Sequence, residues 1–204
     1  PRADVRDRLV GAPSIAALPR GARLGTSAPR RRAQMLRLRP DLEIALLRGN
    51  VQTRLAKLER GEVDATLLAA AGLERLGLHE IGAPIAIDQL LPAPSQGAIG
   101  MEICAGNAGI ARLLAVINDM PTWACVEAER AFLSGLSGDC RSPVAALATM
   151  EGDMIRLKAE IYSVDGAHME AGEAVLARGA EGAAALGRDT LARAHSAVRD
   201  AFPG

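Results

Sequence analysis

The sequence has few aromatic residues, no excess charge of either sign and no long apolar run. Only 2% of its 204 residues are aromatic, so its cores must be aliphatic and few rings are available to stack nucleic-acid bases. Its 24 Lys and Arg residues balance 24 Asp and Glu residues, whereas a general nucleic-acid binder normally has a basic excess. No apolar run reaches the roughly 18 residues of a membrane-spanning helix, and the chain does not open on a signal peptide. These absences argue against nucleic-acid binding and membrane insertion.

Cysteine is scarce and irregularly spaced. Cys104, Cys125 and Cys140 are odd in number and form no CxxC pair. This spacing excludes a disulfide framework and most structural zinc patterns, and it favours a reducing, cytoplasmic compartment. The three histidines are scattered, so we expect no metal site. Cys104 and Cys125 fall in apolar segments and are expected to be buried, whereas Cys140 lies in a polar loop.

Lysine is rarer still, because Lys57 and Lys158 are the only two in the chain. Nearly all of the positive charge is therefore arginine. Genomic composition would explain this bias, and it also fits the high Ala and Gly content. Carboxylate recognition is the alternative explanation, because a guanidinium binds a carboxylate through two parallel hydrogen bonds. Composition leaves both explanations open, and only the positions of the arginines can decide between them.

The first part of the chain predicts alternating strands and helices after a linker at residues 1–20. The strands are expected at 22–24, 43–47 and 65–69, and the helices at 29–38, 51–59 and 71–76. Thr26 and Ser27 offer hydroxyls to cap the first helix, which Pro29 suits in its first turn, and Asn50 is placed to cap the second helix. This order predicts a parallel-rich α/β sheet whose ligand crevice lies at the carboxyl ends of the strands.

The second part of the chain predicts a different architecture. Prolines at 84, 92 and 94 mark a boundary, beyond which the elements expected are a strand at 97–103, helices at 110–118 and 121–133, strands at 144–150, 154–162 and 169–177, and a closing helix at 186–198. We expect Trp123 and Phe132 to be core residues. The predicted fold class is therefore α/β, with a parallel-rich domain followed by a small α+β domain that contains a three-stranded antiparallel sheet.

Arginines gather at both expected strand-to-helix turns. Arg30, Arg31 and Arg32 occupy a first helical turn, where a cation faces the positive end of the helix dipole at a cost of a few tenths to about 1 kcal/mol each. Such a local violation often marks a functional site, and free N–H groups there favour anions. Arg48 and Arg54 repeat the arrangement at the next turn. These positions predict a crevice for a ligand with several carboxylates, although a solvated basic patch or separate surface salt bridges would also explain them.

Two further segments could carry chemistry. Cys140 sits in the Gly-rich loop 135–143 between Asp139 and Arg141, and a nearby arginine can favour a thiolate, although an ordinary exposed thiol is equally compatible. No Cys-His or Ser-His-Asp set accompanies it, which argues against a protease-type nucleophile. Gln96 and Gly97 could offer an amide and a backbone N–H to a ligand, or they could form a plain turn.

Five motifs follow one another in a fixed order along the chain. They are LGTSxxRR at 24–31, LRGNVxTRLxKL at 47–58, LAxAGLxRLG at 68–77, LPAxxQGAxG at 91–100, and ExERA at 127–131 before GDC at 138–140. In order and spacing this series resembles the hydroxymethylbilane synthase (porphobilinogen deaminase) family over nearly the whole chain.

The resemblance implies a cytoplasmic transferase of haem (porphyrin) biosynthesis. Members of the family polymerise four porphobilinogen molecules into the linear tetrapyrrole hydroxymethylbilane and release ammonia. They carry a dipyrromethane cofactor on a loop cysteine through a thioether, and this position corresponds to Cys140. Neither nucleic acid nor membrane is implied as a partner. The cofactor-binding positions that the resemblance implies are Thr26, Ser27, Arg30, Arg31, Arg48, Arg54, Gln96 and Cys140.

The family fold has two domains that resemble periplasmic binding proteins and a third that carries the cysteine. The resemblance implies that residues 1–94 form the second domain, 95–117 return to an incomplete first domain, and 118–204 form the C-terminal domain. The chain starts at Pro1 rather than Met, and we expect a fragment that lacks most of the first domain. That segment would hold the catalytic aspartate, so no catalytic residue is assigned here; neither Glu102 nor Asp139 takes that role.

Such a fragment is expected to be inactive. The full-length enzyme is expected to be monomeric, and the fragment to self-associate through its vacated interface. The alternative function is a non-catalytic, carboxylate-binding α/β module. Two positions depart from the family pattern. Ala28 replaces a common serine that touches the cofactor, and Ser95 replaces a common glycine, which matters little if that turn has negative φ.

Overall fold

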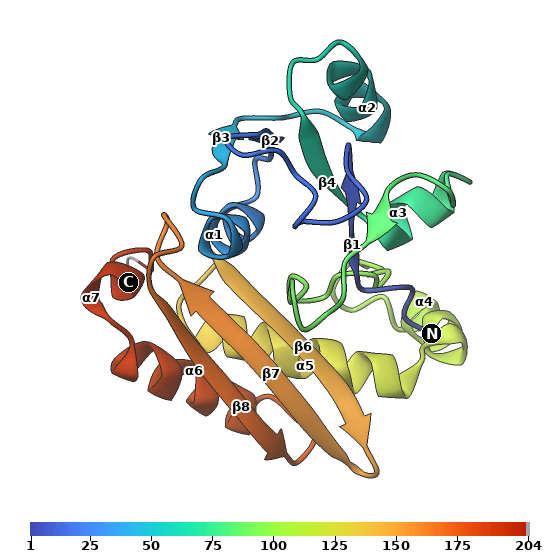
Figure 1. Cartoon of the computed structure of the whole chain (residues 1–204). Helices are drawn as coiled ribbons and strands as arrows, with labels where there is room; N and C mark the ends of the chain where they lie inside the picture. The colour runs from blue at the N-terminus through green and yellow to red at the C-terminus, as the bar shows by residue number, and fades with distance from the viewer. Residues whose placement is uncertain (203–204) are drawn as a thin grey trace.

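Two β-sheets organise the structure, which is a computed structural model that describes residues 1–202 (Figure 1). The first sheet has the strand order β3-β2-β4-β1-β5, with β1 at Asp7–Val10, β2 at Arg23–Gly25, β3 at Glu43–Ala45, β4 at Ala65–Ala69 and β5 at Ala83–Pro84. The second is antiparallel in the order β6-β7-β8, with β6 at Val144–Glu151, β7 at Met154–Tyr162 and β8 at Met169–Leu176. This arrangement confirms the predicted fold class.

The parallel part of the first sheet contains the predicted strand–helix alternation. Strand β2 pairs in parallel with both β3 and β4. The connections are helices α1 (Pro29–Leu38) and α2 (Val51–Glu59), and α3 (Ala70–Arg75) follows β4. Because the three strands run in one direction, the chain leaves β2 and β3 at the same edge of the sheet. We call it the carboxyl edge, and both strand-to-helix turns lie there.

The prediction of a linker at residues 1–20 is wrong, because this segment contains β1. Strand β1 runs antiparallel to β4, and its residues Asp7 and Leu9 are buried, with 1% and 0% of each whole residue exposed. Its four residues, Asp7-Arg8-Leu9-Val10, are two charged followed by two apolar, so the sequence lacks the polar–apolar alternation that indicates a strand. Since β1 is antiparallel to β4, its first residue lies at the carboxyl edge.

The prediction of a strand at 97–103 is also wrong. Gly97 has a φ of +83°, and the residues that follow it form no strand in the described chain. The side chains of Ile99 and Met101 are 73% and 50% exposed, and Cys104, predicted to be buried, is exposed too. An apolar run becomes a strand only where a sheet edge is available to pair with it. The next element is helix α4 (Ala108–Ile117), as predicted.

The helices of the C-terminal part cover one face of the second sheet (Figure 1). They are α5 (Met120–Gly135), α6 (Glu181–Arg193) and α7 (Ser196–Arg199). Phe132 is fully buried as predicted, but Trp123 is 56% exposed and the expectation that it is core is wrong. The helix predicted at 186–198 begins earlier, at Glu181, and breaks at Ala194, whose extended backbone ends α6. None of the helices in the described residues is both long and apolar enough to cross a membrane.

A buried carboxylate connects the N-terminus and the turn at Ser95 to the second sheet. Glu129 of α5 is 0% exposed, and its oxygens lie 2.6 and 3.0 Å from the guanidinium nitrogens of Arg2. The same carboxylate accepts hydrogen bonds from the backbone N–H groups of Ser95 at 2.6 Å and Ala148 at 2.8 Å. Ser95 has a φ of +65°, so the condition of a negative φ at this turn is not met. Glu129 thereby fixes the N-terminus and the turn at Ser95 to α5 and β6.

Candidate functional site

The turn between β2 and α1 leaves the start of the helix without a side-chain cap. The N-cap residue is Ala28, so the prediction that Thr26 or Ser27 caps this helix is wrong. The buried Thr26 hydroxyl instead accepts a hydrogen bond from the Ala28 N–H at 3.2 Å, and Ser27 is exposed. Helix α1 therefore begins with a partial positive charge that no side-chain acceptor offsets at the cap position.

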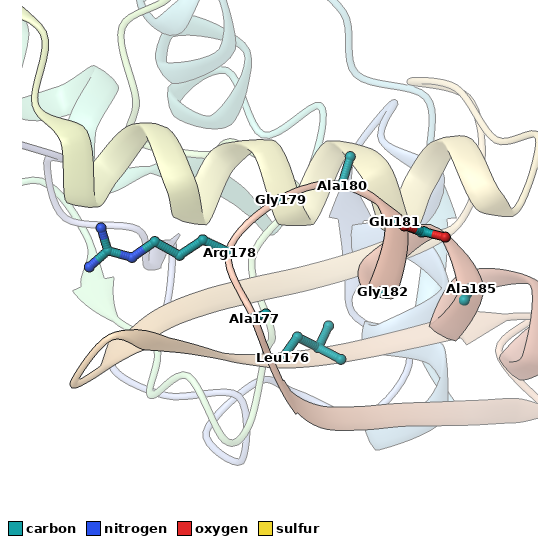
Figure 2. Close-up of a pocket in the computed structure, with 8 residues that line it drawn as sticks. All are labelled: Leu176, Ala177, Arg178, Gly179, Ala180, Glu181, Gly182 and Ala185. Carbon is teal, nitrogen blue, oxygen red and sulfur yellow. The ribbon is translucent and has the colours of Figure 1, made fainter.

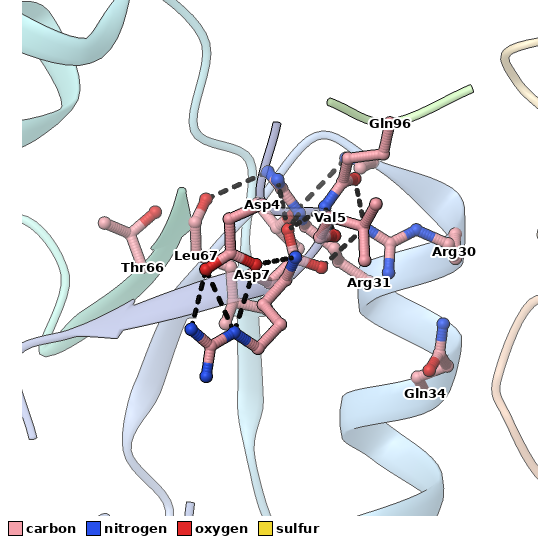
Figure 3. A network of polar contacts seen from close by, with 12 residues as sticks. Asp4, Val5, Asp7, Arg30, Arg31, Gln34, Thr66, Leu67 and Gln96 are labelled. Atoms are coloured by element: carbon pink, nitrogen blue, oxygen red, sulfur yellow. Dashed lines mark hydrogen bonds and ion pairs between the residues drawn. The ribbon is translucent and has the colours of Figure 1, made fainter. Parts of the chain in front are cut away.

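Arg30 and Arg31, in the first turn of α1, converge on one carboxylate (Figure 3). Asp7 Oδ2 accepts from Arg30 Nη2 at 2.7 Å, and Asp7 Oδ1 accepts from Arg31 Nη2 at 2.7 Å and from Arg31 Nε at 3.2 Å. The three side chains are 0%, 5% and 11% exposed, in the order Asp7, Arg30 and Arg31. Asp7 of strand β1 thus brings together Arg30 and Arg31, the two cations placed unfavourably at the positive end of α1.

Gln96 joins this network from the turn after Pro94. Its Oε1 accepts from Arg30 Nη2 at 3.3 Å, and its Nε2 donates to the Val5 carbonyl at 2.7 Å and to Asp7 Oδ1 at 3.2 Å. The sequence offered a plain turn and a ligand-binding amide as alternatives for Gln96. In the structure its amide contacts the arginine network.

Backbone carbonyls take up further guanidinium N–H groups. Arg31 Nη1 donates to the Leu67 carbonyl at 2.9 Å. Arg30 Nη1 and Gln34 Nε2 both donate to the Leu91 carbonyl, at 2.7 and 2.9 Å. A carbonyl oxygen accepts these hydrogen bonds without adding a negative charge. The carbonyls therefore hold the guanidinium groups in place without neutralising them.

The charges in this network do not cancel. Burial alone would raise the pKa of the Asp7 carboxyl, but the charges of Arg31 and Arg30 outweigh it and hold that pKa below its ordinary value. Burial lowers the pKa of Arg30, and the charge of Asp7 acts in the opposite direction. Two guanidiniums face one ionised carboxylate, which leaves one positive charge in a largely buried position. An anionic ligand would complete the balance.

The second strand-to-helix turn places a third cation, Arg54, within electrostatic range of Arg31. Asn50 caps α2 as predicted, accepting from the Thr53 N–H at 2.9 Å. Arg54 is half-buried, and its Nε donates to the Gly49 carbonyl at 3.0 Å. Burial, and then the charge of Arg31, lower the pKa of Arg54, so the two guanidiniums are close enough to repel each other. We call Arg30, Arg31 and Arg54 the arginine cluster.

Arg48 stands apart from these three. Its side chain is exposed, and its carbonyl lies 3.5 Å from Lys57 Nζ. The structure thus brings together three of the four arginines that the sequence assigned to one crevice. Arg48 lies at the same edge, between β3 and α2, with its side chain exposed.

Cys140 lies exposed on the loop between α5 and β6. Arg141 forms an ion pair with Asp139 at 2.9 Å, and this hydrogen bonding raises the pKa of Arg141. The loop leads into Ala145, which packs in a small buried cluster with Ala33 of α1. Ala145 lies five positions after Cys140, so the two Cα atoms are at most about 18 Å apart. The exposed thiol therefore lies on a loop that leads into β6, the strand whose Ala145 packs against the helix of Arg30 and Arg31.

A surface hollow lies away from the arginine cluster. Its lining residues, drawn in Figure 2, run from Leu176 to Gly182 with Ala185, at the connection between β8 and α6. Strand β8 starts beside the end of β7, next to α1, so its far end is at the opposite end of the second sheet. The hollow includes no residue of the arginine cluster.

Sequence reasoning missed Asp7 and Glu129 as organising residues. Glu129 belongs to a motif that carried the family resemblance, yet nothing in its helix indicated a buried carboxylate with four donors. For Asp7 one signal exists. A helix with arginines and no acid in its first turn requires a counter-charge from elsewhere if those arginines are buried.

Comparisons with known proteins identify both halves of the chain. Residues 1–112 match the family model described as porphobilinogen deaminase, dipyromethane cofactor binding domain. Residues 123–194 match porphobilinogen deaminase, C-terminal domain.

Similar relatives carry the same name. The porphobilinogen deaminase of Sphingopyxis alaskensis is 59% identical over 207 residues, which cover 98% of this chain and 65% of the relative. That of Paracoccus denitrificans is 50% identical over 192 residues, covering 93% of this chain and 61% of the relative. That of Roseiflexus castenholzii is 52% identical over 168 residues, covering 81% and 55%. The chain thus spans 55–65% of the length of these relatives. With the first family model matching more than half of its residues, this chain belongs to the porphobilinogen deaminase family.

Proposed function

We propose that this chain supplies the arginine-lined cleft and the cofactor cysteine of a transferase that polymerises four porphobilinogen molecules into hydroxymethylbilane with release of ammonia. The observation that carries the proposal is the surplus positive charge of the arginine cluster at the carboxyl edge, together with an exposed thiol on the loop that leads into β6, which packs against α1 through Ala145 and Ala33. Family membership and the names of the relatives support the same reaction. The reaction belongs to cytoplasmic haem biosynthesis.

The residues present fit a dipyrromethane cofactor by the chemistry of their donors. Its acetate and propionate groups are anions, and Arg30, Arg31 and Arg54 offer guanidiniums with a net surplus of charge. Cys140 offers an exposed sulfur for a thioether. When bound, dipyrromethane supplies the pyrrole to which substrate units are added.

The protein side chains act mainly by positioning. Guanidiniums held by fixed partners orient a polycarboxylate without reorganising, which lowers the entropic cost of bringing reacting rings together. Arg48, exposed at the same edge, would take a carboxylate that lies further from the buried network. Thr26, Ser27 and Gln96 would add neutral hydrogen-bonding groups around the same cleft, so that ligand recognition does not rest on charge alone.

The domain assignment follows the same proposal. Residues 1–94 would form a binding-protein-like domain, 95–117 a segment returning to a preceding domain, and 118–204 the domain that carries Cys140. We assign no catalytic acid to these 204 residues: Asp7 is held by two arginines, and Glu129 is occupied by four hydrogen-bond donors. The 204 residues by themselves are therefore expected to bind porphobilinogen without polymerising it.

A chimaera tests the proposal directly. The aligned part of this chain, 98% of its residues, would replace the corresponding region of the Sphingopyxis alaskensis relative. Porphobilinogen consumption and intact protein mass would then be measured. We expect turnover and a mass increase of two linked pyrrole units, with the adduct located on Cys140 by peptide mapping.

Matched thiol variants make the result specific. In the chimaera, Cys140→Ser should abolish both the adduct and turnover, whereas Cys104→Ser, which changes another exposed thiol, should preserve both. A folded chimaera that binds porphobilinogen but neither carries an adduct nor turns over would refute the transferase assignment. It would leave the non-catalytic, carboxylate-binding module as the function.

A further inference from the structure

Asp7 occupies an unusual place for a carboxylate. Helix starts and surplus guanidiniums at the carboxyl edge all favour an anion there, and the ligand of the proposed function is itself anionic. An acid fixed in that position would neutralise part of the site. Even so, Asp7 is 1% exposed and sits at the first position of β1, where the antiparallel pairing with Ala69 of β4 holds its backbone at that edge.

The contacts of Asp7 fix orientation as well as charge. One oxygen accepts from Arg30 and the other from Arg31, so the two guanidiniums are held on opposite sides of a single carboxylate. Arg31 uses both Nε and Nη2, which defines the plane of its guanidinium as well as its position. Gln96 donates to the same oxygen as Arg31 and, through its own oxygen, accepts from Arg30.

We infer that Asp7 is a positioning residue for the anion site: it locks Arg30 and Arg31 in the ligand-free protein, in the orientation that receives the carboxylates of the tetrapyrrole. This inference rests on the proposed function for the identity of the ligand. The locking itself does not depend on the ligand, so it can be measured separately. Because Arg30 and Arg31 share the single carboxylate of Asp7, one positive charge remains at the site although both guanidinium groups are held in fixed positions.

The inferred role of Asp7 predicts a change in anion affinity that is opposite to the change expected from charge alone. Asp7→Asn removes a negative charge from the site, and charge alone would make anions bind more tightly. If Asp7 acts by positioning, the freed guanidiniums lose their fixed planes. The variant should then bind porphobilinogen about tenfold more weakly despite its extra positive charge, a change equivalent to about 1.4 kcal/mol.

The experiment begins with the unmodified 204-residue chain and no ligand. Order parameters of the guanidinium Nε–H groups would be measured by NMR. Arg30 and Arg31 should approach the value of about 0.85 typical of rigid groups, whereas exposed Arg48 should fall below about 0.6. Low values for Arg30 and Arg31 would overturn the inference, whether or not any variant folds.

The variants complete the test through affinity, measured by calorimetry with porphobilinogen. Asp7→Asn should lower the Arg31 order parameter and weaken binding, and Asp7→Glu, which keeps the charge, should restore part of both. Asp41→Asn is the matched control, because Asp41 forms a similar ion pair with Arg39 beyond the opposite end of α1, and it should change neither. Equal or tighter binding by a folded Asp7→Asn variant would overturn the inference. Failure of the unmodified chain to bind porphobilinogen, with Arg30 and Arg31 rigid, would count against the ligand in the proposed function while the locking by Asp7 stood.

Discussion

Glu129 offers the most demanding test of how the N-terminus and the turn at Ser95 are held against α5 and β6. Its carboxylate is fully buried and receives four N–H donors, two from Arg2 and one each from the backbones of Ser95 and Ala148. Glu129→Gln keeps the size of the side chain but removes its charge and replaces one acceptor oxygen by an NH2 donor. That donor would face N–H groups that are donors themselves.

The expected loss follows from the buried ion pair. Removing one partner of such a pair costs about 3–5 kcal/mol, because the other charge stays buried without compensation. Arg2 would be left in this state, since its side chain is only 11% exposed. In a protein of this size each kcal/mol lowers the melting temperature by about 2–4 °C, so the variant should melt roughly 10 °C lower.

Chemical denaturation of the 204-residue chain measures this loss, and two controls define its origin. Glu127→Gln changes a half-buried acid two positions earlier in α5 and should alter the unfolding free energy by no more than about 0.5 kcal/mol. Arg2→Met removes the partner, and the double variant should be less destabilised than the sum of the single variants, by at least about 1 kcal/mol. A loss below about 1 kcal/mol for Glu129→Gln, or strict additivity with Arg2→Met, would refute this account of the junction.

Three other changes have defined outcomes. Ala28→Ser should stabilise the chain by about 1 kcal/mol in denaturant unfolding, because the N-cap of α1 lacks a side-chain acceptor. Gly166→Ala should cost about 3 kcal/mol, since an added Cβ would lie 2.2 Å from the Ala33 carbonyl at a φ of +75°, whereas Gly152→Ala, with open space and a φ of +60°, should cost about 1 kcal/mol. The pKa of Asp7 is lowered in the folded protein, so its ionised form stabilises the fold above about pH 4, and this contribution is lost as the pH falls further. The free energy of unfolding, measured between pH 6 and pH 2, should therefore decline less in Asp7→Asn than in the unmodified chain.

The regular elements were largely predictable because local signals coincide in them. Asn50 combines a capping side chain with the start of a periodic apolar pattern, and the structure has both the cap and helix α2. The turns at Gly152 and Gly166 separate three strand-like runs, and these are β6, β7 and β8. In each case a few neighbouring residues determine the conformation, so a single sequence contains the information.

The exposed apolar segment was not predictable, for a different reason. Ile99, Met101 and Trp123 lie in patterns typical of buried elements, yet all three are at least half exposed. Hydrophobic patterning indicates that a surface favours burial, but it does not say which residues cover it. The strand predicted at 97–103 and the core position predicted for Trp123 both rested on apolar character alone, and both predictions are wrong.

Only the arginines of the candidate site were predictable from the sequence; the acid that binds them was not. Arg30 and Arg31 stood out because they violate a local rule, and a local rule can be checked within one helix. Asp7 lies more than twenty residues earlier, in a strand too short to detect, and its meaning depends on a pairing that only the sheet reveals. Sequence reasoning therefore located an anion site without finding the acid that organises it.

The ratio of two arginines to one carboxylate has a physical logic of its own. With no acid at the carboxyl edge, Arg30 and Arg31 would repel each other beside the positive end of α1, and burying both would be prohibitively costly. With one acid for each arginine the network would be neutral and would offer an incoming carboxylate no net attraction. A single buried Asp7, supplemented by the neutral carbonyls of Leu67 and Leu91, allows both guanidiniums to be ordered and buried while one positive charge remains. The antiparallel direction of β1 makes this possible, because it presents the first residue of that strand at the edge where the parallel strands end.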